Sequence, residues 1–488
     1  MSVGTRRQRL VLLGLFLLSL PLVTTRIYSS DEIQYFAYLR SLWFDRDLSF
    51  ENEYRYFYDR GIARSEGFHE TFLERTTEAG RRVNFGTIGC AILWSPFYLV
   101  GDLTARLLHA AGRPVEVDGF SRPYIAAVAY GSAFYGAAAL ALAMSSAALL
   151  GLRGLVAAIA VWLGTPLLFY MYVAPPMSHA CSAFAVALFV YVWLRVRRTW
   201  SPRGAAALGA AGALMAMVRE QDLFFIVGPV ADFAISSARS AAADNAEYGA
   251  ADRTEHGATD HTEYGATDHT DYTDVQKYAR TVVAAVVSFA VVFTPQALAY
   301  VRLNGHLGPS RLVTRKMTWT APHALQVLAS PQHGFFVWTP LAALALGGLI
   351  WMTLGRGRRI AICMLLMYAS QVYVSGSVES WTVAGGYGQR RFVALTSLLV
   401  IGLAALQEGG RRVAARRTVA VLTVIAIYWN IALVAEFGTE LMDRQRLSPA
   451  QNAYDAFVTL PREAPSLVYR YLFDRSSFYR PPAPERRE

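Results

Sequence analysis

The sequence predicts an all-α polytopic membrane protein with about eleven transmembrane helices. Of its 488 residues, 54% are hydrophobic and only 17% are charged, and the mean hydropathy is +0.28. This composition is too apolar for a soluble multidomain protein. Apolar runs long enough to cross hydrocarbon as helices recur from Leu10 to Phe437. The runs do not alternate every second residue, which argues against an outer-membrane β-barrel.

Each predicted span is an apolar run between polar or basic ends. The first one follows Arg6, Arg7 and Arg9 and has no small-x-small cleavage site after it, so we expect a retained helix rather than a signal peptide. The eleven spans are expected at about 10–23, 123–149, 155–173, 179–196, 204–218, 223–237, 280–301, 336–354, 358–375, 391–407 and 418–436.

A further apolar segment, 85–108, is expected to lie along the outer leaflet or dip into it. The basic loops 195–203, 355–359 and 411–417 should be cytoplasmic by the positive-inside rule. Counting back from them places Asp31 outside only if 85–108 does not cross. The alternative is a twelfth span with one violation of the rule.

These spans divide the chain into two membrane modules. The N-terminal module, 1–237, contains a long first outer loop at 26–122, and the C-terminal module covers 280–437. Between the modules, 238–279 repeats with the pattern EYGAADRT, EHGATDHT, EYGATDHT. Because this segment has almost no aliphatic residues, we expect a disordered cytoplasmic linker. The tail 438–488 should be periplasmic, and the sequence leaves its fold open.

Two simpler features exclude other classes of protein. Cys90, Cys181 and Cys363 lie inside apolar stretches without CxxC spacing, so we expect packing residues and no disulfide or metal framework. The net charge of +10 comes from basic residues at the ends of apolar runs. It therefore indicates membrane orientation, and we expect no nucleic-acid partner.

Asp31 and Glu32 form an acidic pair directly after the first span. Ser29 or Ser30 can cap a helix that begins there, and carboxylates suit the first turn of a helix. A carboxylate at the mouth of a membrane cavity is also well placed to remove a proton from a hydroxyl group. Both interpretations stay open at this point.

A glycine-rich outer segment, SWTVAGGYGQRRF, leads into Gln389, Arg390 and Arg391 at the start of a predicted span. Arginines at this position need a partner, and phosphate suits a bidentate guanidinium next to exposed backbone N–H groups. A structural salt bridge to Glu379 or Asp222 is the alternative.

Three further outer motifs carry polar residues at the membrane edge. His333 in SPQHGFF is either a helix cap or a ligand. Arg219 in VREQD either pairs with Asp222 or contacts a lipid phosphate, and His179 follows the break in PPMSHA.

The order of these motifs resembles bacterial members of the GT-C superfamily of integral-membrane glycosyltransferases, which includes protein O-mannosyltransferases and lipid A aminoarabinose transferases. The resemblance covers about residues 10–437 and rests on SSDEIQYFAYLRSL, VNFGTIGCAILWSPFYLV, PPMSHA, VREQD, SPQHGFFVWTP and GGYGQRRF. It implies outer-leaflet helices in the first loop, a polyprenyl-phosphate-linked sugar as donor and a catalytic Asp, matched here by Asp31. NFGTIG stands where the family often has Lys-Pro-Pro or Lys-Tyr-Pro, which leaves the contacts of this segment open.

We therefore expect a hexosyl or pentosyl transferase that moves a sugar to a hydroxyl group of a lipid, glycan or protein acceptor. It would work with inversion on the outer face of the bacterial cytoplasmic (inner) membrane. Asp31 is the expected general base, with Glu32 beside it. The expected ligands of the leaving phosphate are Arg390, Arg391, Arg219 and His333, and the expected substrate contacts are Tyr35, His179, Gln389, Tyr387 and Trp381.

No cofactor is expected, because no outer motif combines three carboxylate or histidine ligands at short spacing. A divalent cation is the alternative, held by Asp31 with other outer carboxylates. The main rival function is a multi-spanning transporter or lipid flippase, which usually shows repeat symmetry and polar groups near the midplane. A third possible function is that of a non-enzymatic assembly partner.

Overall fold

The computed structural model describes residues 3–63, 65–239, 269–383, 385–409 and 413–478. Within these ranges every regular element is helical, and the only β-type pairing consists of two isolated bridges. Six helices are long and apolar enough to cross a membrane: Arg122–Leu149, His179–Val196, Gln276–Asn304, Arg358–Ser377, Arg390–Gly409 and Val413–Thr439. The predicted all-α membrane character is confirmed at this level.

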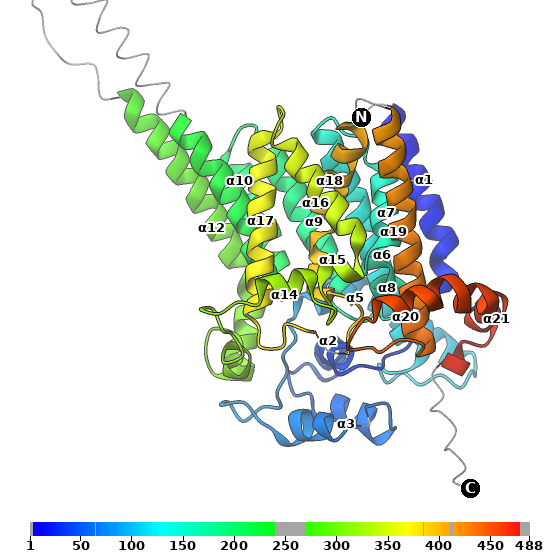
Figure 1. The fold of residues 1–488 in the computed structure, drawn as a ribbon. Helices are drawn as coiled ribbons and strands as arrows, with labels where there is room; N and C mark the ends of the chain where they lie inside the picture. The colour runs from blue at the N-terminus through cyan, green and yellow to red at the C-terminus, as the bar shows by residue number, and fades with distance from the viewer. Residues whose placement is uncertain (1–2, 64, 240–268, 384, 410–412, 479–488) are drawn as a thin grey trace, which may run out of the picture.

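The helices of the central bundle pack side by side (Figure 1). They are α1 (Val3–Ser19), α6 (Arg122–Leu149), α7 (Leu155–Gly164), α8 (Leu167–Tyr172), α9 (His179–Val196), α10 (Pro202–Val218), a helix over 227–239, α12 (His269–Asn304), α15 (Phe335–Trp338), α16 (Pro340–Met352), α17 (Arg358–Ser377), α18 (Thr396–Gly409) and α19 (Val413–Thr439). Short 3-10 helices occur at η1 (Leu20–Leu22), η4 (Glu220–Ile226) and η5 (Arg390–Leu395).

Five predicted spans are not continuous α-helices, and 10–23 and 223–237 are two of them, because η1 ends the first and η4 begins the second. The run 155–173 is divided into α7 and α8 at Pro166, and 336–354 is divided into α15 and α16 at Pro340. Proline has no N–H to donate to the preceding turn, so it ends a helix or begins a new one. The run 391–407 begins as the 3-10 helix η5 before it continues as α18.

The predicted linker boundary at residue 279 is also too late. Helix α12 begins at His269, inside the last repeat, and the residues from there to Thr294 include no glycine or proline to stop a helix. The rest of the repeats, 247–268, lies outside the described residues.

A layer of shorter helices covers the end of the bundle opposite to the start of α1 (Figure 1). From the first outer loop it contains α2 (Ser30–Arg40), the π-helix η2 (Ser41–Asp45), α3 (Glu51–Asp59), α4 (Glu66–Phe68), the π-helix η3 (His69–Glu74) and α5 (Gly89–Ala110). Later segments add α13 (Arg311–Thr314), α14 (Ala324–Ala329), α20 (Pro449–Tyr454), the π-helix η6 (Asp455–Thr459), α21 (Leu460–Phe473) and the 3-10 helix η7 (Arg475–Phe478).

Hydrogen bonds fix the start and the middle of α5. Thr87, just before α5, donates a hydrogen bond of 2.9 Å to the carbonyl of Val218 at the end of α10. Farther along, the hydroxyl of Tyr98 donates to the carbonyl of Gly119, in the loop before α6, at 2.8 Å. Four apolar side chains on one side of α5 are exposed: Leu99, Val100, Leu103 and Leu107. This is the pattern expected of a helix that rests in the outer leaflet.

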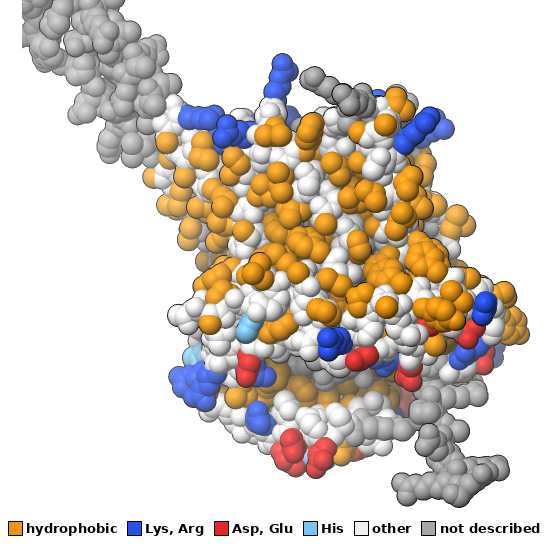
Figure 2. All heavy atoms as spheres, in the orientation of Figure 1, with side chains coloured by type: hydrophobic (Ala, Val, Ile, Leu, Met, Phe, Trp, Pro, Cys, Tyr) orange, Lys and Arg blue, Asp and Glu red, His pale blue; other side chains and the backbone are white. Residues whose placement is uncertain are grey.

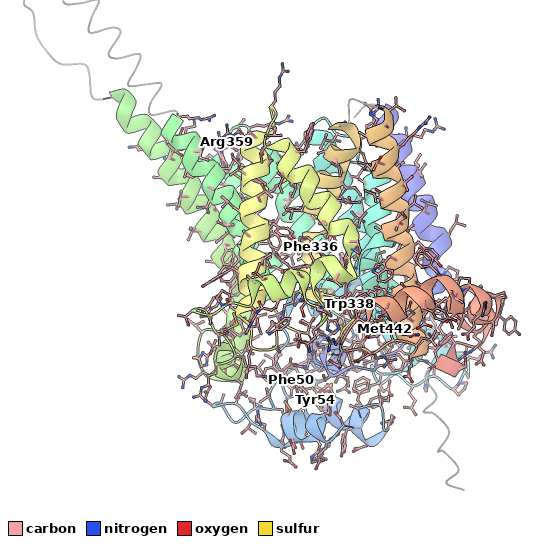
Figure 3. The ribbon with its side chains drawn as sticks, viewed as in Figure 1. Phe50, Tyr54, Phe336, Trp338, Arg359 and Met442 are labelled. Carbon is pink, nitrogen blue, oxygen red and sulfur yellow. The ribbon has the colours of Figure 1, made fainter. Side chains whose placement is uncertain are left out.

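Aromatic packing fixes α2 to the rest of the first loop. Phe50 and Tyr54 are fully buried, and their rings are 6.0 Å apart at the start of α3 (Figure 3). Tyr38 of α2 packs against Phe50 at 4.9 Å, and the hydroxyl of Tyr54 donates to the carbonyl of Val83 at 3.0 Å. Buried aromatic rings contribute large apolar areas with defined geometry, so α2 has a rigid support near its C-terminal end.

The opposite end of the bundle carries a buried ion-pair cluster. Asp232 is fully buried and contacts Arg197 at 2.7 Å and Arg359 at 2.6 Å, and Figure 3 labels Arg359 at this end. Figure 2 shows a band of hydrophobic side chains between two charged ends, as expected for a protein that spans a bilayer.

The described part of the tail, up to Phe478, contacts the end of the first helix. The guanidinium group of Arg475 donates to the carbonyls of Pro21 and Val23 at 2.7 and 2.9 Å, and the hydroxyl of Tyr471 donates to that of Leu22 at 2.9 Å. The tail therefore satisfies carbonyl groups where the first outer loop begins.

Candidate functional site

The site is centred on an ion pair between the two halves of the chain. Asp31 lies in the first turn of α2, and Arg390 is the first residue of η5. The Oδ2 atom of Asp31 is 2.8 Å from Nη1 of Arg390, and the two side chains are 39% and 21% exposed. Arg390 therefore pairs with neither Glu379 nor Asp222, the two partners that its sequence suggested.

Glu32 caps α2 and does not point toward Arg390. Its Oε2 accepts hydrogen bonds from the backbone N–H groups of Tyr28 and Ser29 at 2.7 and 2.8 Å, and the hydroxyl of Ser29 accepts from Glu32 N at 3.3 Å. Burial raises the pKa of Glu32 to about 7. The reciprocal bonds form a capping box, so Glu32 fixes the turn that carries Asp31.

Arg219 extends the basic side of the site. It ends α10, and its Nη1 contacts Nδ1 of His179, the first residue of α9. Its Nη2 donates to Gln221 at 3.3 Å, and the amide of Gln221 reaches the carbonyl of Arg391 at 3.5 Å. The structure thus brings the predicted residues Arg219, His179 and Arg391 together.

Asp222 does not neutralise Arg219 by direct contact. Its Oδ2 instead accepts a hydrogen bond of 2.6 Å from the hydroxyl of Ser182. Burial raises the pKa of Asp222 to about 6, although the positive charge of Arg219 acts in the opposite direction. A local Arg219–Asp222 ion pair, which was one of two expectations, is not formed.

Arg391 completes a group of three arginines. Its Nη1 donates to the carbonyl of Ser380 at 3.1 Å, and it lies within electrostatic range of Arg390, Arg219 and Asp31. Arg390 and Arg391 are adjacent in the chain, and Gln221 links Arg219 to the carbonyl of Arg391; guanidinium groups suit a planar, multiply charged anion such as phosphate. Tyr35, one turn after Asp31, is within electrostatic range of the same carboxylate and of Arg219.

The glycine-rich segment shapes the backbone next to Arg390. Gly385 and Gly388 have φ angles of +76° and +57°, which other residues adopt only with strain. A Cβ atom on Gly388 would lie 3.0 Å from Cγ of Pro166, and one on Gly386 would lie 2.9 Å from Cδ of Arg390. The glycines therefore permit a close approach of the segment to the arginine.

Two predicted substrate contacts are occupied by protein groups. Gln389 is fully buried, and its amide donates to the carbonyls of Trp381 and His333 at 3.2 and 3.4 Å. Tyr387 is also buried; its ring stacks on Phe169 at 4.8 Å. These side chains hold the glycine-rich segment in place rather than facing open space.

His333 is buried in a strained backbone conformation. Its φ angle is +61°, and its ring stacks on Trp338, labelled in Figure 3, at 4.6 Å. Burial lowers the pKa of His333 to about 4, and the charge of Arg390 acts in the same direction. A neutral imidazole supplies no positive charge for a phosphate group, so His333 contributes through packing and the turn that it forms.

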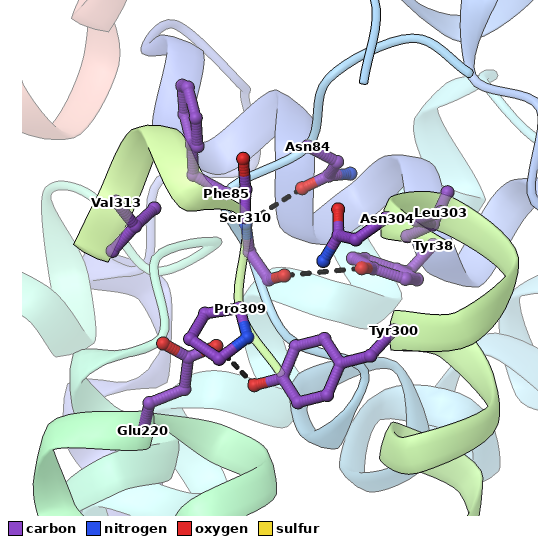
Figure 4. Close-up of a pocket in the computed structure, with 11 residues that line it drawn as sticks. Tyr38, Asn84, Phe85, Glu220, Tyr300, Leu303, Asn304, Pro309, Ser310 and Val313 are labelled. Carbon is purple, nitrogen blue, oxygen red and sulfur yellow. Dashed lines mark hydrogen bonds between the residues drawn. The ribbon is translucent and has the colours of Figure 1, made fainter. Parts of the chain in front are cut away.

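Figure 4 shows a small polar pocket lined by Tyr38 of α2, by Glu220 and by the outer end of α12. Glu220 accepts a hydrogen bond from the hydroxyl of Tyr300 there, and burial raises the pKa of this glutamate. The hydroxyl of Tyr38 donates a hydrogen bond to the carbonyl of Gly86. The ring of Tyr35 lies against the Cα atom of Gly86, where a Cβ atom would meet it. The chain segments 84–86 and 303–313 form the remaining walls.

Among the described residues, no group of three or more histidine, cysteine or carboxylate side chains lies close enough together to hold a metal ion. The three cysteines are buried and unbonded. The chain matches no protein-family model, and no curated protein matches it.

Sequence reasoning did not find two structural partners of the site. Ser380 holds Arg391 through its backbone, and backbone contacts leave no residue-specific signal. The Glu220–Tyr300 hydrogen bond joins residues far apart in the chain. Only the position of Glu220 beside Arg219 could have suggested it.

Proposed function

We propose that this protein is a membrane glycosyltransferase of the GT-C type, which transfers a hexose or pentose from a polyprenyl-phosphate donor to a hydroxyl acceptor. The observation that carries the proposal is the 2.8 Å contact between Asp31 and Arg390. Arg391 follows Arg390 in the chain, and Gln221 links Arg219 to the carbonyl of Arg391. A carboxylate next to several guanidinium groups combines a proton acceptor with ligands for a phosphate leaving group.

The proposed topology has eleven spans, with α5 in the outer leaflet and the site facing the outside of a bacterial cytoplasmic membrane. The start of α1 and the layer that contains α2 lie at opposite ends of the bundle (Figure 1), which supports an outer position for Asp31. The basic loops 195–203 and 355–359 then lie on the cytoplasmic side, in agreement with the positive-inside rule.

In the proposed reaction, the oxygen of the acceptor hydroxyl attacks the anomeric carbon while Asp31 accepts the proton of that hydroxyl. The bond between that carbon and the phosphate oxygen breaks, and its electron pair stays on the phosphate. Attack from the side opposite to the leaving group inverts the anomeric centre. The polyprenyl phosphate is a weak base that needs charge stabilisation more than protonation, which Arg390, Arg391 and Arg219 supply.

Three further residues have roles in this proposal. Tyr35 and His179 lie beside the charged groups and would contact the sugar or the phosphate. Glu32 acts on Asp31 through the helix cap, and is therefore a positioning residue.

The proposal is tested by incubating the purified protein with a membrane extract and following polyprenyl-phosphate lipids by mass spectrometry. We expect the wild type to convert a sugar-linked lipid to free polyprenyl phosphate, with the mass difference identifying the sugar, and Asp31→Asn to do so at least about 100-fold more slowly. Asp59→Asn, an exposed change in the same loop, is the matched control. If wild-type protein changes no sugar lipid in an extract that contains acceptor, the proposal is wrong, and transport becomes the hypothesis to test.

A further inference from the structure

The outer segment 302–335 has an unusual charge balance. It contains Arg302, Arg311, Arg315 and Lys316 but no aspartate or glutamate. All four cationic side chains are exposed. Short outer loops of membrane proteins are normally poor in lysine and arginine, so orientation in the membrane does not account for this group, which we call the basic patch.

The basic patch surrounds the outer end of α12. Figure 2 shows blue side chains gathered below this helix, where α13 lies in Figure 1. Glu78 of the first loop contacts the basic patch, with its carboxylate 3.6 Å from His306 and 3.7 Å from Arg311. Arg302, Arg315 and Lys316 have no ion-pair contact within 4.0 Å in the part of the chain that the structure describes.

Neighbouring aromatic residues indicate the depth of the basic patch. Trp319, three residues after Lys316, is 42% exposed, and its ring lies 5.9 Å from both Phe224 and Tyr373. Exposed tryptophan and tyrosine side chains concentrate at the membrane–water interface. The basic patch, directly beyond them, is therefore at the level of the outer lipid headgroups.

Backbone pairing connects the basic patch to the candidate site. Thr318 N donates to the carbonyl of Ser377 at 2.6 Å, and Glu379 N donates to that of Lys316 at 2.8 Å. The next residue, Ser380, holds Arg391. On its other side, α13 forms a wall of the small pocket, which also contains Glu220 beside Arg219.

We infer that the basic patch binds a phosphate or carboxylate group carried by a lipid-linked acceptor. This inference rests on the proposed function and adds the chemical class of the acceptor. The three arginines at Asp31 are placed to hold the donor phosphate, whereas the basic patch is a second cationic surface at headgroup depth. An acidic headgroup bound there would keep an acceptor hydroxyl beside the site, and neutral glycolipids would lack this contact.

Lipid binding gives the first test, by native mass spectrometry of the full-length protein in neutral detergent with phosphatidylglycerol or phosphatidylcholine as the probe. We expect preferential binding of phosphatidylglycerol, and a loss of about tenfold or more in the variant with Arg311→Gln, Arg315→Gln and Lys316→Gln. The control changes Arg198, Arg356 and Arg358 to glutamine at the other end of the bundle, where all three are exposed.

A second variant, which removes a negative charge and should strengthen binding, keeps this test decisive if the triple variant folds poorly. Glu78→Gln removes the acid next to His306 and Arg311, and should strengthen phosphatidylglycerol binding. The inference is overturned if the two triple variants lose phosphatidylglycerol binding equally. It is also overturned if the wild type does not prefer phosphatidylglycerol and Glu78→Gln leaves this binding unchanged.

Sugar transfer gives the second test and separates this inference from the proposed function. We expect the triple variant at the basic patch to raise the KM for acceptor about tenfold while the rate at saturating acceptor and the KM for donor stay near those of the wild type. An unchanged acceptor KM with weaker phosphatidylglycerol binding would show a bulk-lipid contact and refute the acceptor site. Absence of any transfer by the wild type would refute the proposed function, while the binding result would still report on the basic patch.

Discussion

Asp31 and Arg390 should act as one catalytic unit, which a double-mutant cycle can measure. The cycle compares Asp31→Asn, Arg390→Gln and the double variant. Each change keeps a polar side chain and removes one charge of the 2.8 Å pair; Asn has the size of Asp, whereas Gln is shorter than Arg. In the proposed mechanism, Arg390 both holds the carboxylate and stabilises the leaving phosphate, so removal of either partner should impair the function of the other.

The magnitudes follow from the role of each group. Loss of a general base costs about 100- to 10,000-fold in rate, and loss of one charge-stabilising donor costs about 100- to 1,000-fold. Independent groups would multiply these factors, to at least about 10,000-fold in the double variant. Groups that act as a unit give a double variant within about tenfold of the slower single variant.

The assay is single-turnover release of polyprenyl phosphate, with thermal unfolding of each purified variant as the control. Because the Asp31 side chain is 39% exposed, breaking the pair should cost only about 0–1 kcal/mol of stability. Multiplicative rate losses would show that the two residues work separately. A rate of Asp31→Asn within about twofold of the wild type would remove it as the base.

Three further changes test the surroundings of the site. Glu32→Gln should keep transfer, whereas Glu32→Ala should lower stability by about 1 kcal/mol through loss of the cap with Ser29, as measured by thermal unfolding; a loss of transfer in a stable Glu32→Gln variant would argue for a direct role. Burial raises the pKa of Glu53 from 4.5 to about 7, so its contribution to stability is complete below about pH 4.5 and is lost as the pH rises through about 7. Unfolding temperatures measured from pH 5 to 8 should therefore fall less in Glu53→Gln than in the wild type; identical profiles would contradict this. Gly388→Ala should cost about 1–2 kcal/mol, because φ is +57° and Pro166 is 3.0 Å from the added Cβ, and should slow transfer; unchanged unfolding and activity would refute the need for glycine.

The sequence predicts long helices better than their interruptions. The expected spans 123–149 and 179–196 agree closely with α6 and α9, because length and apolar composition determine such helices. The break at Pro166 was not predicted, although proline has a known effect on helices. It depends on how α7 and α8 pack against their neighbours.

The candidate site shows the same division. Asp31 and the arginines were recognisable because charged residues at a membrane edge are uncommon. Asp31 was not recognisable as the partner of Arg390, because a contact between α2 and η5 joins segments far apart in the sequence. Gln389 and Tyr387 were expected to face a substrate, but burial and hydrogen bonds commit them to the protein.

The contact of Arg475 with the carbonyls of Pro21 and Val23 has a consequence for biosynthesis. Residues 21–23 leave the ribosome early, and the side chain that satisfies them is made only after the last membrane helix, α19. The contact that fixes the start of the first outer loop can therefore form only after synthesis has reached Arg475. A nascent chain that stalls after α19 can already have all its membrane helices inserted, yet it lacks the contact that secures the approach to Asp31.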